Sequence, residues 1–138
     1  MARNLDSALV AIGHVQSPLT DPASAPKQGH EGSPPSSIIF DAEFAEGLEG
    51  FEAGGEMIVL TWLDRADRDV LRTHPRDDLR NPETGVFRTR SPARPNPIGL
   101  HRVWIDSIDG LRFGVRDLEA LDGTPVLDVK PPLNDWER

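Results

Sequence analysis

The chain has 138 residues, a formal net charge of −8 and no cysteine. This length fits one domain with its own core, and the lack of cysteine excludes disulfides, thiolate metal sites and a cysteine nucleophile. No stretch approaches the roughly 18 apolar residues of a membrane-spanning helix, and the N-terminus does not have the pattern of a signal peptide. We therefore expect a cytoplasmic protein with no membrane association.

The first half of the chain predicts short strands around one long loop. Residues 16–37 predict the loop, because they hold five prolines, and a loop of that length inside a compact domain is usually functional or mobile. Asp41 is expected to N-cap a short helix over residues 42–46 that Gly47 ends. Strands are predicted over residues 8–15, 37–40 and 57–63.

The second half predicts β structure after a charged region. Residues 65–72 predict one or two helical turns, and residues 72–83 predict a loop. Asp109 and Gly110 predict a two-residue hairpin turn. Strands are predicted to start at Val86–Phe87 and to span residues 98–108, 111–115 and 126–129.

Short antiparallel strands joined by Gly and Pro turns are typical of a small barrel. The strand–helix alternation and Gly-rich first turn of a doubly wound fold are missing. We therefore predict a mainly β protein, a small antiparallel β-barrel with one or two short helices, formed by residues 1–138 as a single domain. Trp62 and Trp104 are expected in its core.

Residues 85–100 read GVFRTRSPARPNPIGL and are the most informative segment. Alternate prolines predict a stiff, non-helical loop, which loses little entropy on binding and aims its arginines in advance. Six arginines lie between residues 88 and 116 against two acids. This local basic face suits a small anionic ligand or a carboxylate. Surface or dimer-interface ion pairs remain the alternative use of these arginines.

Residues 85–100 closely resemble the signature loop of the TsaA-like (TrmO) family of S-adenosylmethionine-dependent methyltransferases. Several long, specific motifs in the family's order are stronger evidence than one short motif. The further segments that resemble the family are IGHVQSP (12–18), PKQ (26–28), GLEGF (47–51), TWL (61–63) and DGTPVLDVKP (122–131).

The resemblance implies a small β-barrel that forms a homodimer, with S-adenosylmethionine bound near the subunit interface. It implies methyl transfer, and the family's best-understood activity is N6-methylation of threonylcarbamoyladenosine beside the tRNA anticodon. Longer bacterial members carry an additional C-terminal domain, which we expect this chain to lack.

The cofactor contacts that we expect come from four parts of the chain. They are Pro26, Lys27 and Gln28; Asp64 and Arg65; Arg90, Arg94 and Leu100; and Leu121, Asp122, Gly123 and Thr124. The resemblance supplies most of them, and Arg94 is added because a guanidinium can bind a carboxylate or a substrate anion with two hydrogen bonds. On the sequence alone, residues 121–125 are an ordinary turn.

The catalytic group stays open. A neutral nitrogen acceptor loses a proton around the transfer step, so a base helps, and the candidates are Asp64, Asp122, Asp128 and His101. Family members usually carry a Phe–His or histidine-rich segment where this chain has Leu63–Asp64. The histidines show no paired spacing of metal ligands, so we expect no metal site.

The sequence leaves open two kinds of methyl acceptor and two functions other than methyl transfer. The leading hypothesis is a methyltransferase that acts on tRNA, and the main rival is a methyltransferase that acts on a small molecule. A non-catalytic S-adenosylmethionine-binding module and a dimeric interaction module, in which the arginine loop meets acids of a partner subunit, are the alternatives.

Overall fold

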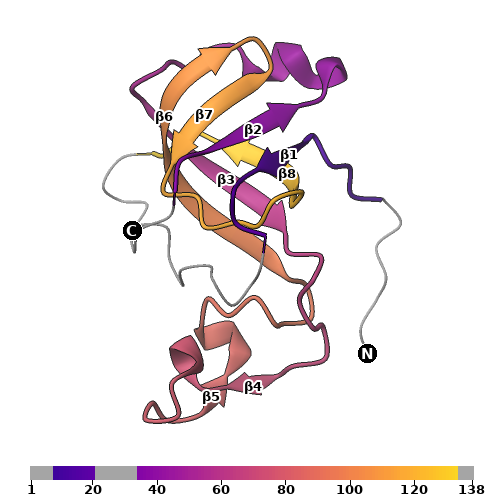
Figure 1. The fold of residues 1–138 in the computed structure, drawn as a ribbon. Helices are drawn as coiled ribbons and strands as arrows, with labels where there is room; N and C mark the ends of the chain where they lie inside the picture. The colour runs from indigo at the N-terminus through magenta and orange to yellow at the C-terminus, as the bar shows by residue number, and fades with distance from the viewer. Residues whose placement is uncertain (1–7, 21–33, 134–138) are drawn as a thin grey trace.

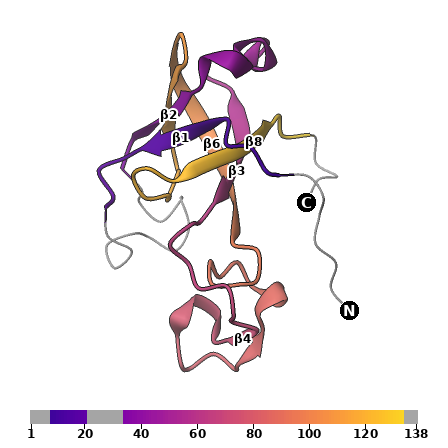
Figure 2. The same cartoon turned by 90° about the vertical axis from the view of Figure 1, so that its right-hand side faces the viewer.

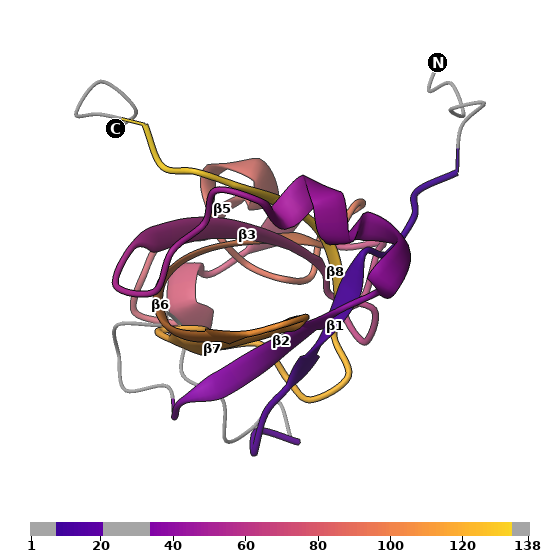
Figure 3. The ribbon, with the colours of Figure 1, turned by 90° about the horizontal axis from the view of Figure 1, so that it is seen from above.

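The computed structural model describes residues 8–20 and 34–133 (Figure 1). Six strands form a closed antiparallel barrel in the spatial order β1-β2-β7-β6-β3-β8. Figure 3 shows the strands curving around the barrel interior. The predicted small antiparallel barrel is confirmed. Its strands are β1 (Gly13–Gln16), β2 (Ser36–Phe40), β3 (Glu56–Trp62), β6 (Ile98–Asp109), β7 (Arg112–Arg116) and β8 (Pro125–Lys130).

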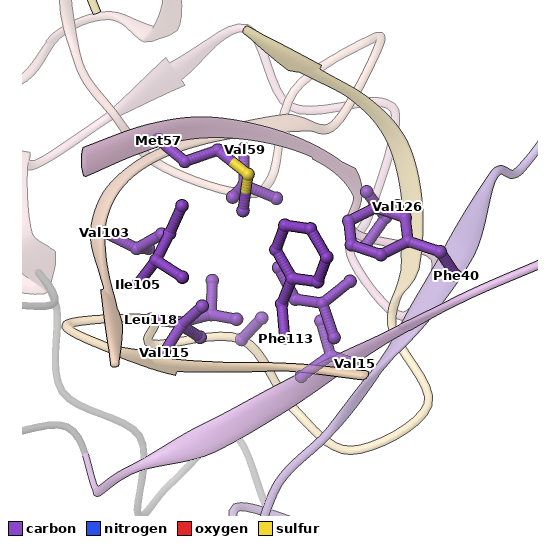
Figure 4. Packing of buried hydrophobic residues seen from close by; sticks show 12 residues of the cluster. Val15, Phe40, Met57, Val59, Val103, Ile105, Phe113, Val115, Leu118 and Val126 are labelled. Atoms are coloured by element: carbon purple, nitrogen blue, oxygen red, sulfur yellow. The ribbon is translucent and has the colours of Figure 1, made fainter. Parts of the chain in front are cut away.

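Strict alternation of inward and outward side chains builds the core. In β3 the inward positions are Met57, Val59 and Thr61, and β6 alternates in the same way. The inward apolar side chains meet in the barrel interior (Figure 4). Two register shifts, one in the β6–β7 pair and one in the β3–β8 pair, are irregularities of the kind that bend strands so that a sheet can close.

Strand β1 closes the barrel because it pairs with two strands. Gly13 is opposite Phe40 of β2 and also opposite Val126 of β8. A Cβ atom on Gly13 would lie 2.5 Å from the carbonyl oxygen of Ile39. Glycine is therefore required where the backbones of β1 and β2 approach each other this closely.

The directions of the strands place the connections β1–β2, β3–β6 and β7–β8 at the same end of the barrel. Strands β1, β3 and β7 finish there, and β2, β6 and β8 begin there, as the pairs Gln16↔Ser37, Trp62↔Ile98 and Thr61↔Val126 show. We call this the loop end. The opposite end carries the β6–β7 hairpin and the short helix η3 (Ala42–Leu48).

A lobe, residues 65–97, projects from the loop end between β3 and β6, as both side views show (Figures 1 and 2). It contains β4 (Arg72–Thr73) paired with β5 (Thr84–Gly85), and the 3-10 helices η4 (Pro75–Asp77) and η5 (Val86–Arg88). Among the described residues, no helix is long and apolar enough to cross a membrane.

Three predicted elements in the lobe are wrong. Residues 65–71 form a turn, bends and irregular backbone and no helical turn, residues 72–83 hold β4 and η4, and η5 replaces the strand predicted from Val86. The reason is pairing with distant backbone. The N–H of Arg94 donates to the carbonyl of Asp67 at 3.0 Å, and the N–H of Val86 donates to Leu71 at 2.9 Å.

The barrel elements follow the sequence more closely. Five predicted strands are confirmed to within one residue at each end, while the first strand begins only at Gly13. The hairpin turn is confirmed but lies one residue later, because Asp109 still pairs with Arg112. The predicted helix after Asp41 is a 3-10 helix that runs through Gly47, and Asp41 makes no side-chain cap.

Trp62 and Trp104 are not among the buried core residues. Trp62 and Trp104 occupy outward positions of β3 and β6, and Trp104 is 40% exposed. Ile98 and Leu100, which face the same way on β6, are 44% and 49% exposed. Placing both tryptophans in the core was wrong, because strand alternation turns them away from the interior. We call Trp62, Ile98, Leu100 and Trp104 the outer apolar face.

We expect Gly13→Ala to lower the free energy of unfolding by about 2 kcal/mol, because the added methyl group forces β1 and β2 apart. Urea denaturation measures the change. Gly47→Ala is the matched control, since nothing lies within 4 Å of its added Cβ, and it should change stability by no more than about 0.5 kcal/mol. Equal denaturation midpoints for the two variants would contradict this account of barrel closure.

Candidate functional site

The loop end gathers three segments that the sequence places far apart. Residues 17–20 follow β1, residues 63–97 connect β3 to β6, and residues 117–124 connect β7 to β8. Leu118 and Ala120 of the last segment are buried against the barrel core. Residues 117–124 are therefore anchored to the core at two positions.

Residues 121–124 form a tight turn that displays its central residues. Thr124 is buried, and its hydroxyl donates to the carbonyl of Leu121 at 2.7 Å. Gly123 has a φ of 83°, which favours glycine, and its N–H donates to Val15 of β1 at 2.7 Å. Asp122 and Gly123 are exposed at the tip.

Asp122 joins this turn to the segment after β1. Its carboxylate Oδ1 accepts a hydrogen bond from the N–H of Ser17 at 3.0 Å, and its own N–H donates to Leu19 at 2.7 Å. One carboxylate oxygen is thus used to hold the segment that follows β1.

Arg65 connects the same two segments to the lobe. Its Nη1 donates to the carbonyl of Thr20 at 3.2 Å, and its Nη2 donates to the carbonyl of Asp122 at 3.3 Å. Asp64 is exposed beside it, in a turn where its N–H donates to Trp62 at 2.9 Å. Arg65 therefore joins the segment that carries Asp64 to the 121–124 turn.

Arg94 braces the loop that carries it. Its Nη1 donates to the carbonyls of Thr89 at 2.8 Å and Ser91 at 3.1 Å, and its guanidinium lies 5.7 Å from the centre of the Phe87 ring. These contacts fix the path of the loop across residues 87–94. Much of the Arg94 side chain's hydrogen-bonding capacity is used within the protein.

Arg68 is a site residue that the sequence analysis missed. Its Nε donates to the carbonyl of Pro95 at 2.8 Å, its Nη2 donates to Asn96 at 3.2 Å, and its guanidinium lies 5.2 Å from the centre of the Trp62 ring. The contacts span 27 and 28 residues, so no local pattern marks Arg68 as different from its charged neighbours.

Arg90 is exposed, and no hydrogen bond or ion pair holds its guanidinium within the described parts of the chain. The loop around it is fixed by Arg94 and Arg68, so Arg90 is a cation presented on a rigid support. That is the arrangement a carboxylate or phosphate ligand needs.

One predicted contact, Leu100, lies away from the turn at residues 121–124. Leu100 is on the outer apolar face, opposite Leu60 in the β3–β6 pair. The 121–124 turn instead packs against β1 at the loop end. Pro26, Lys27 and Gln28 lie outside the described residues.

The candidate bases differ in access. Asp64 and Asp122 are exposed at the loop end, whereas His101 is buried inside the barrel and bonded to Thr61 and Glu119. Asp128 lies on β8, ion-paired with Lys130 at 3.2 Å and beside the hollow under η3. Asp64 and Asp122 are therefore the carboxylates that a ligand at the loop end can reach.

Two exposed ion pairs fix the far part of the lobe. Arg72 hydrogen-bonds Glu83 at 2.7 Å and so lowers the pKa of that carboxyl, and Arg80 does the same for the pKa of Asp78. Both carboxylates stay ionised at neutral pH. Neither pair belongs to the cluster around Asp122.

Comparison with known proteins agrees with this architecture. A model of the tRNA-methyltransferase O N-terminal domain family matches residues 14–137. An S-adenosyl-L-methionine-binding protein from Archaeoglobus fulgidus is 47% identical over 122 residues, which cover 88% of this chain and 86% of the relative.

Longer proteins match as well. A probable S-adenosyl-L-methionine-binding protein from the same organism is 47% identical over 120 residues, but the chain spans only 32% of it. The crystal structure of TrmO from Pseudomonas aeruginosa superposes with a TM-score of 0.73 at 27% identity, over 94% of this chain and 57% of that one. The match to the family model covers nearly the whole barrel and its lobe, and the chain belongs to the tRNA-methyltransferase O N-terminal domain family.

Proposed function

We propose that the chain binds S-adenosyl-L-methionine at the loop end of the barrel and uses it as a methyl donor. The observation that carries the proposal is the Archaeoglobus fulgidus relative, which has nearly the same span and is named for binding this molecule. The resemblance of residues 85–100 to the signature loop of the family supports the same function.

The groups displayed at the loop end fit the chemistry of this cofactor. Its carboxylate suits the guanidinium of Arg90, which can donate two parallel hydrogen bonds. Its amino group and ribose hydroxyls suit the exposed carboxylates of Asp64 and Asp122. Arg65, Arg68 and Arg94 hold the surrounding backbone, as their hydrogen bonds to carbonyl groups show.

S-adenosyl-L-methionine supplies a methyl group activated by a sulfonium. The residues of the chain have the tasks of orienting the reactants, excluding water and accepting a proton. Asp64 and Asp122 are the bases proposed for a neutral nitrogen acceptor, because they are the exposed candidates at this end. A base needs to lie within hydrogen-bond reach of the proton that it removes.

For the acceptor we propose tRNA. The family description and the TrmO crystal structure support this choice, and exposed arginines such as Arg88 and Arg90 in the lobe can contact phosphates. The net charge of −8 favours the rival, a small-molecule acceptor, because nucleic-acid-binding proteins usually carry a basic surface.

We further propose a homodimer that uses the outer apolar face. Exposed apolar side chains on one face of a small protein mark an interaction surface. Ile98, Leu100 and Trp104 are each at least 40% exposed on the outward face of β6, where Arg102 lies between Leu100 and Trp104. A dimer through this face would place Leu100, an expected cofactor contact, at the subunit interface.

We expect Arg90→Ala to weaken S-adenosyl-L-methionine binding by about 1.5–3 kcal/mol, or roughly 10- to 150-fold, the usual scale for a hydrogen bond to a charged group. Isothermal titration calorimetry measures the dissociation constant. Arg88→Ala is the matched control, since it removes the same charge two residues away. Equal losses in the two variants would show a general charge effect, and a wild-type protein that is folded but binds nothing would refute the proposed function.

If tRNA is the acceptor, its binding should fall about tenfold or more between about 50 and about 200 mM salt, because phosphate contacts release counterions. Fluorescence anisotropy with labelled tRNA, over a salt series, measures the slope. Binding that does not respond to salt, or no binding at low salt, would count against tRNA and favour the small-molecule acceptor.

We expect Trp104→Glu to convert the proposed dimer to a monomer, because it places a charge on the outer apolar face. Analytical ultracentrifugation at micromolar concentration measures the mass. Leu79→Glu, at an 81% exposed position of the lobe, is the control and should remain dimeric. A wild-type monomer at every concentration would exclude this assembly.

A further inference from the structure

Three polar side chains form one hydrogen-bonded series inside the barrel, just beneath the loop end. The Thr61 hydroxyl and Nε2 of His101 are 2.7 Å apart, and Nδ1 of His101 and Oε1 of Glu119 are 2.6 Å apart. Thr61 is fully buried, and the side chains of His101 and Glu119 are 3% and 17% exposed.

The series satisfies every group in it. An ionised Glu119 only accepts hydrogen bonds, so Nδ1 of His101 carries a proton and donates it to the carboxylate. The hydroxyl of Thr61 then donates to Nε2 of a neutral ring or accepts from that of a protonated one. A buried polar group without a partner costs free energy, so a side chain that breaks either link leaves a penalty in the core.

The order hydroxyl, imidazole, carboxylate is also that of a nucleophilic triad. Thr61, however, has no exposed surface, so no substrate reaches its oxygen. The series instead links three segments of the chain to one another.

Each member stands next to one part of the proposed cofactor site. Thr61 on β3 precedes Asp64 by three residues, His101 follows Leu100 on β6, and Glu119 precedes Leu121 by two residues. His101 is the member that bonds to both others. It therefore ties the segment leading to the 121–124 turn to the paired strands β3 and β6.

The packing around Thr61 and His101 leaves little room for other side-chain positions. Gly99 is opposite Thr61 in the β3–β6 pair. A Cβ atom on Gly99 would collide with the Thr61 hydroxyl and lie 2.7 Å from Nε2 of His101. The missing side chain at Gly99 makes the space in which the imidazole and the hydroxyl meet.

We propose that His101 is a positioning residue for the cofactor site. Through Glu119 it fixes the 121–124 turn relative to the strands that carry Asp64 and Leu100, although it does not touch the ligand itself. The inference rests on the proposed binding of S-adenosyl-L-methionine and names a residue that sets the geometry of that site.

Two variants separate the two links. The amide nitrogen of an asparagine side chain occupies the place of the histidine Nδ1, so His101→Asn retains the hydrogen bond to Glu119. The amide nitrogen of a glutamine side chain occupies the place of Nε2, so His101→Gln retains only the hydrogen bond to Thr61. By calorimetry, we expect His101→Gln to weaken S-adenosyl-L-methionine binding about tenfold. His101→Asn should stay within about threefold of wild type.

Val103→Ala is the control for a purely structural effect, since Val103 is buried on the same face of β6 and its truncation leaves a cavity. It should lower stability without changing the affinity of the folded protein. If His101→Gln behaves like Val103→Ala in both measurements, His101 only fills the core and the inference is overturned. If His101→Gln does not fold, Glu119→Leu replaces it, because leucine removes the acceptor of the His101 hydrogen bond, and wild-type affinity in that variant overturns the inference equally.

A second measurement does not depend on the ligand. The N–H groups of Gly123 and Thr124 are hydrogen-bonded to Val15 and Leu121, and amide hydrogen exchange reports how often this turn opens. His101→Gln should speed exchange there by about tenfold relative to Val103→Ala of matched stability. Faster exchange together with a wild-type protein that binds no S-adenosyl-L-methionine would refute the proposed function but keep the positioning role. Unchanged exchange would refute the positioning role.

Discussion

The structure depends on the double pairing of β1. This four-residue strand hydrogen-bonds to β2 on one side and to β8 on the other, and without it the sheet would have two open edges. Closure removes the edges, and the antiparallel order brings three connections, one of which contains the lobe, to the same end. Gly13 makes this possible, because a side chain there would meet the backbone of β2. The site is thus a result of closure as much as of the residues that form it.

The arginines at the loop end divide into two groups by what their donors face. Arg65, Arg68 and Arg94 donate to backbone carbonyls of connections that have no regular pairing of their own. They replace the hydrogen bonds that a sheet or helix would supply. Arg90 has no such partner among the described residues, and its charge faces solvent on a loop that the others hold still. The loop that carries Arg90 is therefore ordered before a ligand binds. The conformational entropy of this loop is lost on folding, so it does not reduce the binding free energy.

The buried series of Thr61, His101 and Glu119 connects the core with this surface. Apolar packing fills the barrel interior, but it is not directional. Hydrogen bonds between buried groups are directional and are costly to break. Placed under the loop end, they give the 121–124 turn a defined position relative to β3 and β6, which packing of Leu118 and Ala120 does not specify as closely.

The sequence by itself determined the barrel strands, the hairpin after β6 and the glycine turn at residue 123, because alternation and turn chemistry act over a few residues. Through the family resemblance, it also marked residues 85–100 and 121–124 as expected parts of a cofactor site. The tertiary structure decided the rest. It turned Trp62 and Trp104 outward, gave the lobe its turns through backbone partners 15 and 27 residues away along the chain, and assigned each arginine its role. A guanidinium finds suitable acceptors on any backbone carbonyl, so which one it binds is decided only when the fold brings that carbonyl within reach.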